Sequence, residues 1–321
     1  MFNRRDTIAL FAAGAALAFT GRSALAEDDA KTFRIGWQKG GVLALAKASG
    51  ALDARLKPRG IAVEWNEFTS GPPLLEALGA GALDFGATGD VPPLFAQAAG
   101  GDLLYVAATK GAVDGSAILV KADSPIKTLA DLKGKKLAFK RGSSAHNFAL
   151  KALQSVGLGL DDVTALDLSP PDAAAAFAGR QLDAWAIWDP YYAVTVQDPN
   201  VRVVATTEGI VDAWSYYLAN GSFTKQNPHV VAEVIDELGK AGAAAQANLD
   251  ETAKAISAVN GVPVPIVKIV LTRKGADLGE IIPLNDAVLA YQQTLADDFF
   301  KLKIVPKQLS IKEAFWTPPA V

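Results

Sequence analysis

Residues Ile35–Gly40 read I-G-W-Q-K-G and residues Leu137–Gly142 read L-A-F-K-R-G, each ahead of an apolar helical run. A second pair keeps nearly the same offset, L-D-F-G-A-T-G-D at Leu83–Asp90 and L-D-A-W-A-I-W-D at Leu182–Asp189. In both stretches of this second pair, Leu-Asp precedes a short apolar strand, and a second aspartate follows the strand, ahead of a proline. This duplication predicts two similar α/β lobes whose matching loops face one shared cleft, which is a place to hold a small molecule.

Apolar strand patterns alternate with helix patterns along the chain, which is typical of βαβ units and mostly parallel sheets. Two further strands, expected at 117–120 and 215–219, flank the second lobe and would carry the chain out and back. We expect these two strands to form the hinge. The predicted division places residues 27–117 with 216–321 in a discontinuous first lobe and residues 118–215 in the second.

The N-terminus has the pattern of a secretory signal peptide over residues 1–26. Arg4 and Arg5 precede an apolar run at 8–19, and Ala24-Leu25-Ala26 forms a small-residue cleavage site. The apolar run is shorter than the roughly 20 residues that span a bilayer. Adjacent arginines also permit the twin-arginine route, although Asp6-Thr7-Ile8 fits its consensus poorly, so both export routes stay open. Because the sequence has no cysteine to carry a lipid, we expect a periplasmic protein without a lipid anchor.

The amino-acid composition argues against several classes of function. The chain has 31 basic and 34 acidic residues, a balance that argues against nucleic acid as a partner. Its only histidines are His146 and His229, and no metal-ligand cluster, Walker loop or nucleotide-binding glycine fingerprint occurs. We therefore predict no cofactor, no metal and no catalytic residue. An enzyme on the same fold, with His146 as general base, is the alternative.

The loop R-G-S-S-A-H-N at Arg141–Asn147 has the features of an anion site. A glycine turn leads into a helix whose first N–H groups lack intrahelical partners, and the helix dipole favours negative charge there. Ser143 and Ser144 add hydroxyl donors, although one serine would suffice as the helix N-cap. In the equivalent loop of the first lobe, Gln38 offers an amide donor without adding charge.

Further candidates lie where other strands end. Thr88-Gly89-Asp90 and Asp189-Pro190 read as corners between a strand and a helix, with both aspartates as expected helix caps. Such corners face the ligand cleft in open α/β folds, where Asp90 or Asp189 would also meet a ligand's ammonium group. Of the aromatic residues, Trp188 is expected in the cleft and Trp214 as an apolar wall beside the hinge.

Six motifs, in this order, resemble the aliphatic-sulfonate-binding components of ABC importers, and the resemblance runs from about residue 33 to residue 316. The motifs are Q-K-G at 38–40, T-G-D-V-P-P at 88–93, F-A-Q-A-A-G at 95–100, S-P-I-K-T-L-A-D-L-K-G at 124–134, G-S-S-A-H-N at 142–147 and L-D-A-W-A-I-W-D-P-Y-Y at 182–192. The chain is similar more distantly to taurine-, nitrate- and thiamine-precursor-binding proteins, which remain alternatives for the ligand.

The resemblance implies a type II periplasmic-binding fold, with two α/β lobes, two hinge strands and closure on the ligand. It also implies a monomer that captures an alkylsulfonate and delivers it to the permease and ATPase subunits of a membrane importer. Trp214 departs from the family pattern near the hinge. By resemblance, the sulfonate oxygens are held near Gln38, Thr88, Gly89, Ser143, Ser144, His146 and Trp188.

Overall fold

The chain forms two five-stranded sheets of the same design in a computed structural model that describes residues 30–319. The signal peptide predicted at 1–26 lies outside the described residues. The first sheet, with strand order β2-β1-β3-β10-β4, contains β1 (Thr32–Trp37), β2 (Ala62–Glu67), β3 (Phe85–Gly89), β4 (Leu103–Lys110) and β10 (Trp214–Asn220). The second, with strand order β7-β6-β8-β5-β9, contains β5 (Ser116–Lys121), β6 (Lys136–Phe139), β7 (Thr164–Asp167), β8 (Ala184–Trp188) and β9 (Val201–Thr206).

The two sheets confirm the duplication. β1 lies between two parallel neighbours in the first sheet, and β6 does the same in the second. The sheets are mixed rather than mostly parallel, however, because β10 and β5 run antiparallel to both of their neighbours. Each of these two strands follows directly after the chain has crossed between the lobes, and so enters its sheet from the opposite end.

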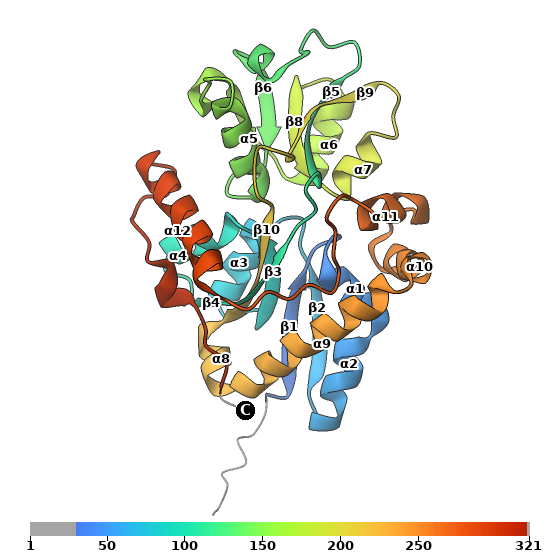
Figure 1. Cartoon of the computed structure of the whole chain (residues 1–321), viewed down its shortest axis with the longest axis vertical. Helices are drawn as coiled ribbons and strands as arrows, with labels where there is room; N and C mark the ends of the chain where they lie inside the picture. Colours follow the sequence, from blue (N-terminus) through green and yellow to red (C-terminus); the bar gives the residue numbers. More distant parts are fainter. Residues whose placement is uncertain (1–29, 320–321) are drawn as a thin grey trace, which may run out of the picture.

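Helices cover both faces of each sheet, and we name the two units lobe 1 and lobe 2 after their sheets (Figure 1). Lobe 1 carries α1 (Val42–Ser49), α2 (Ala51–Leu56), η1 (Lys57–Arg59), α3 (Gly71–Gly79), α4 (Pro92–Ala98), α8 (Gly221–Gln226), α9 (Pro228–Gln246), α10 (Leu249–Asn260), α11 (Val264–Leu271), α12 (Asp286–Lys301) and η4 (Ile311–Ala314). Lobe 2 carries η2 (Leu129–Leu132), α5 (Ser144–Gln154), η3 (Leu160–Asp162), α6 (Pro170–Ala178) and α7 (Tyr191–Thr195).

Side chains that alternate between the two faces of each sheet form the hydrophobic cores. Side chains of successive strand residues point to opposite faces, so the adjacent Tyr216 and Tyr217 enter different clusters on the two sides of the lobe 1 sheet. In β8, Trp185 is buried against Phe177 on one face of the lobe 2 sheet. Trp185 therefore belongs to the core of lobe 2.

The chain crosses between the lobes in two adjacent segments, 111–115 before β5 and 207–213 before β10. These segments are joined by hydrogen bonds from Gly111 N–H to the Ala213 carbonyl, 2.6 Å, and from the Thr207 hydroxyl to the Val113 carbonyl, 2.8 Å. The crossings thus lie just before the two strands expected to form the hinge. Because β1, β3, β6 and β8 end toward the opposite lobe, their following loops meet between the lobes.

Within the described residues, no single helix is long and apolar enough to cross a membrane; α10 and α11 pass that test only as a pair bent by 119°.

Candidate functional site

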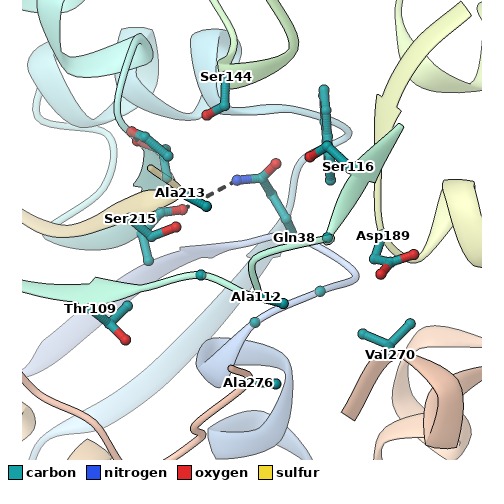
Figure 2. Close-up of a pocket in the computed structure, with 18 of the residues that line it drawn as sticks. Gln38, Thr109, Ala112, Ser116, Ser144, Asp189, Ala213, Ser215, Val270 and Ala276 are labelled. Atoms are coloured by element: carbon teal, nitrogen blue, oxygen red, sulfur yellow. Dashed lines mark hydrogen bonds between the residues drawn. The ribbon is translucent and has the colours of Figure 1, made fainter. Parts of the chain in front are cut away.

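A cleft of about 340 Å³ lies between the lobes, and the predicted loops converge on it (Figure 2). Of the ten residues expected at a ligand site, nine line this cleft, and His146 is the exception. The nine are Gln38, Thr88, Gly89, Asp90, Ser143, Ser144, Trp188, Asp189 and Trp214. They come from both lobes, so a molecule held here would touch both halves of the protein.

Lobe 1 contributes a compact group of polar atoms to the cleft. Gln38 follows β1, and its side-chain amide donates to the Ala87 carbonyl at 3.2 Å, which fixes the side chain across the end of β3. At that same end, the buried Thr88 hydroxyl donates to the Gly89 carbonyl at 3.1 Å. Gly89 faces Ser144 of lobe 2 so closely that an added Cβ would overlap the Ser144 hydroxyl.

Lobe 2 contributes the start of α5. Gly142 adopts φ 74°, in the left-handed region that favours glycine, and so turns the chain from β6 toward the helix. Ser143 occupies the N-cap position, but its hydroxyl donates to the Lys140 carbonyl at 2.7 Å and makes no cap bond. The uncapped start of the helix and the Ser144 hydroxyl therefore face lobe 1, where the hydroxyl hydrogen-bonds to the Asp90 carboxylate.

Asp90 does not cap α4, contrary to expectation. Val91 holds the N-cap position, and the Asp90 carboxylate instead accepts hydrogen bonds from Asn147 of lobe 2 at 2.9 Å and from Tyr291 of α12 at 3.0 Å. Burial raises the pKa of Asp90, while hydrogen bonds from Tyr291, Ser144 and Asn147 act in the opposite direction. Asp90 thus joins the two lobes at the cleft.

His146 lies behind the α5 loop, away from the cleft lining. Its ring stacks on Phe139 at 5.0 Å between centroids and meets Phe299 of lobe 1 edge-on at 5.5 Å. Its Nδ1 accepts the Gly142 N–H at 3.2 Å, so the imidazole holds the turn. Burial, followed by the charge of Arg141, lowers the pKa of His146 to about 4, so the ring is neutral at pH 7. The structure therefore places it in the packing under the loop, where it supports the site indirectly.

Asp189 is held by a residue that the sequence patterns did not single out. Its carboxylate forms two bonds with Arg273 of lobe 1, 2.7 Å to Nε and 3.2 Å to Nη2, and also accepts the Ala193 N–H of α7 at 3.0 Å. The Arg273 guanidinium lies 4.1 Å from the centre of the Tyr192 ring. Pro190 holds the N-cap position of α7, so Asp189 is not the expected cap, but its carboxylate accepts one N–H of that helix and bridges the lobes. Arg273 is separated from it by 84 positions, and no local motif marks it.

Aromatic and hydroxyl side chains complete the lining. Trp188 lies at the end of β8, and Trp214 lies at the start of β10 with the Lys110 ammonium 5.4 Å from its ring centre. Four small hydroxyl residues that our site prediction omitted also line the cleft, namely Thr109, Ser116, Thr207 and Ser215. Tetrahedral anions have several acceptor oxygens, and such neutral donors suit them in a site that excludes water.

The charged groups of the lining are partly neutralised within the protein, since Asp189 is paired with Arg273. Among residues 30–319, no group of three or more histidine, cysteine or acidic side chains is arranged to hold a metal ion. The side chains and the start of α5 that line this cleft are suited to bind an anionic group through hydroxyl and amide donors. The nearest imidazole, that of His146, is committed to packing.

Comparisons with known proteins agree with this geometry. The NMT1/THI5 like family model matches residues 56–252. A relative from Escherichia coli (strain K12) that is named for binding aliphatic sulfonates is 40% identical over 294 residues, 91% of this chain and 91% of that protein. The alkanesulfonate-binding protein SsuA from Xanthomonas axonopodis pv. citri bound to MOPS superposes with a TM-score of 0.84 at 38% identity, covering 90% of this chain and 99% of that one. The periplasmic aliphatic sulphonate binding protein SsuA from Escherichia coli has a TM-score of 0.81 at 38% identity, covering 91% and 94%.

Proposed function

This chain belongs to the NMT1/THI5-like family and, within it, to the aliphatic-sulfonate-binding proteins, and we propose that it captures aliphatic sulfonates for an ABC importer. In this role it resides in the periplasm without a lipid anchor, binds its ligand as a monomer and delivers it to the permease and ATPase subunits in the membrane. The imported sulfonate serves as a source of sulfur. The protein works as a carrier and catalyses no reaction.

The observation that carries this proposal is the meeting of uncharged donors from two lobes at one point. Gln38, Thr88 and Gly89 approach from lobe 1, and Ser144 with the start of α5 approaches from lobe 2. A sulfonate remains anionic at physiological pH and has three acceptor oxygens, so it matches donors that add no charge of their own. MOPS, which is bound to the related Xanthomonas protein, has a sulfonate as its acidic group.

The binding energy is within reach of such a site. A micromolar dissociation constant corresponds to about 8 kcal/mol. Each hydrogen bond to a charged group contributes roughly 1.5–3 kcal/mol, so five or six of them reach that value after the entropy of ordering is subtracted. Closure of the lobes strengthens these bonds because it removes competing water.

A ligand panel followed by thermal unfolding tests the proposal. Ethanesulfonate and propanesulfonate are expected to raise the melting temperature of the protein freed of residues 1–26, because a ligand that binds only the folded state stabilises it. Taurine, nitrate and a thiamine-precursor pyrimidine serve as competing ligand classes. If only nitrate or the pyrimidine stabilises the protein, the sulfonate assignment is wrong.

Direct contact is tested at the start of α5. Replacing Ser144 by alanine removes one hydroxyl donor and is expected to weaken sulfonate binding by roughly tenfold or more. The matched change Ser155→Ala, at the far end of the same helix, removes a hydroxyl that donates to the Ala152 carbonyl and should leave affinity unchanged. Equal affinity in both variants would remove Ser144 from the site.

A further inference from the structure

Asp90 brings a carboxyl group to the point where the sulfonate is proposed to bind. It lines the cleft beside Gly89, has only 2% of its surface exposed, and hydrogen-bonds to the Ser144 hydroxyl. An ionised Asp90 would hold the Ser144 hydrogen away from a ligand and would repel an anion at that point. Two buried negative charges side by side are unfavourable unless a cation compensates them.

No such cation contacts Asp90 among the residues that the structure describes. Lys151 of α5 is paired instead with Asp298 of α12 at 2.8 Å. On the elements packed around Asp90, the titratable groups that interact with its charge are three phenols, those of Tyr105 of β4, Tyr216 of β10 and Tyr291 of α12. The surroundings of Asp90 therefore suit a neutral carboxyl group better than a carboxylate.

The hydrogen bonds of Tyr291 also favour a proton on Asp90. The Tyr291 hydroxyl oxygen lies 2.8 Å from the Asp212 carbonyl oxygen and 3.0 Å from Asp90 Oδ2. A hydroxyl has one hydrogen, and a carbonyl oxygen has none to donate. If Tyr291 donates along the shorter contact, to Asp212, the hydrogen of the other contact must come from Asp90. A protonated Asp90 thus gives both contacts a donor and an acceptor, whereas an ionised Asp90 leaves one contact without a hydrogen.

Closure of the lobes controls how buried this carboxyl group is. Burial is the main cause that raises the pKa of Asp90 in the closed form. When the lobes separate, Ser144 and Asn147 of lobe 2 leave Asp90, and water reaches it from the cleft. In the open form the pKa of Asp90 therefore moves toward the usual aspartate value of 3.8.

Resting on the sulfonate function proposed above, we propose that Asp90 is a positioning residue that takes up a proton when the lobes close on a sulfonate. The proton lies on Oδ2 and is donated to Tyr291, whose own hydrogen is donated to the Asp212 carbonyl. The Ser144 hydroxyl, no longer held by a full negative charge, donates to the sulfonate. One proton from the solvent enters with each sulfonate and balances its charge, so the closed site needs no lysine or arginine beside the anion.

Calorimetric titration with propanesulfonate between pH 5.5 and pH 7 tests this proposal. Bis-Tris and cacodylate serve as buffers, because neither carries a sulfonate group and their different heats of ionisation reveal the number of protons taken up. Since the pKa of Asp90 is raised in the closed form, affinity is full below pH 3.8 and falls as the pH rises. Relative to Asp90→Asn, the unaltered protein should lose up to about tenfold in affinity per pH unit and take up about one proton more per sulfonate at pH 6.

The same comparison separates Asp90 from other titratable groups. His146, whose pKa is lowered by burial to about 4, would release a proton on closure, and Asp189 is paired with Arg273. Both groups remain in Asp90→Asn, so the difference between the two proteins reports Asp90 alone. Asp161→Asn, at an exposed position of lobe 2, is the matched control and should take up as many protons as the unaltered protein.

Infrared difference spectroscopy detects the proton on the carboxyl group directly. At pH 6 an ordinary aspartate is less than about 1% protonated, so propanesulfonate should add the C=O band of a protonated carboxyl group that Asp90→Asn lacks. Absence of this band from the unaltered protein, or equal proton uptake by the unaltered protein and Asp90→Asn, would overturn the proposal. An affinity loss in Asp90→Asn that is the same at every pH would show a purely structural role and would also overturn it. Failure of every sulfonate to bind the unaltered protein at any pH would instead reject the proposed function.

Discussion

Removing the Arg273 side chain tests whether contacts between the lobes set ligand affinity. Arg273 of lobe 1 forms a two-bond ion pair with Asp189 of lobe 2, and its guanidinium lies against Tyr192 of the same lobe. Both ion-pair side chains are nearly buried, with 11% and 9% of their surfaces exposed. These contacts exist only while the lobes are together, so the substitution Arg273→Met acts on the closed form.

The expected magnitude follows from this burial. Removing one partner of a buried ion pair costs about 3–5 kcal/mol, because the other charge is left without compensation. Residual exposure of the pair favours the lower end, about 3 kcal/mol, which corresponds to a loss of roughly 100-fold in sulfonate affinity. In the open form, water solvates Asp189, so the melting temperature of the ligand-free protein should change less than affinity does.

Calorimetric titration with a sulfonate measures this loss. The control is Arg180→Met, which breaks a similar two-bond pair with Asp123, 3.0 Å for each bond, on the surface of lobe 2. That pair is 60% and 66% exposed, so water screens its charges and its loss should leave affinity unchanged. Adding Asp189→Asn to Arg273→Met should restore part of the affinity, because it removes one of the two carboxylates, Asp189 and Asp114, that Arg273 contacts. If Arg273→Met binds sulfonate as tightly as the unaltered protein, the ion pair has no part in closure.

Two further outcomes are expected. Gly89→Ala places a methyl group on the Ser144 hydroxyl and 3.1 Å from the Ser144 Cβ. Calorimetric titration should therefore show that sulfonate affinity falls by roughly tenfold or more. The control is Gly159→Ala, whose added methyl group meets no atom within 4 Å, and this variant should bind sulfonate normally. His146 has its pKa lowered from 6.5 to about 4, so its contribution to folding stability is present above pH 6.5 and is lost as the pH falls toward 4. Between pH 6.5 and pH 4, denaturant unfolding should show that the free energy of unfolding of the unaltered protein falls by on the order of 3 kcal/mol more than that of His146→Gln. Parallel pH profiles of the two proteins would contradict a lowered pKa for His146.

The local features of the site were predictable because they depend on short stretches of chain. A glycine after an apolar strand, followed by hydroxyl residues and a helix pattern, specifies a turn into a helix start wherever it occurs. Gln38, Thr88, Gly89 and Ser144 were therefore predicted to lie at the cleft, and the structure places them in its lining. The duplication of these motifs was also sufficient to predict two equivalent sheets facing one cleft.

Other features depend on residues that are distant in the sequence. Asp90 was expected to cap α4, but its carboxylate is held by Asn147 and Tyr291, the latter 201 positions away. His146 was expected to contact the ligand, yet ring packing against Phe299 of the other lobe turns it under the loop. Both outcomes follow from burial between lobes, which no local pattern encodes.

The sequence by itself determined that two lobes with anion-binding corners would face each other, since strand periodicity and turn residues act within a few positions. Only the tertiary structure decided which charges remain available in the cleft. Arg273 neutralises Asp189, and α11 places Val270 across the cleft from Ser144. The physical reason is that electrostatic pairing and the exclusion of water depend on distances in space, and these are set when segments from both ends of the chain pack together.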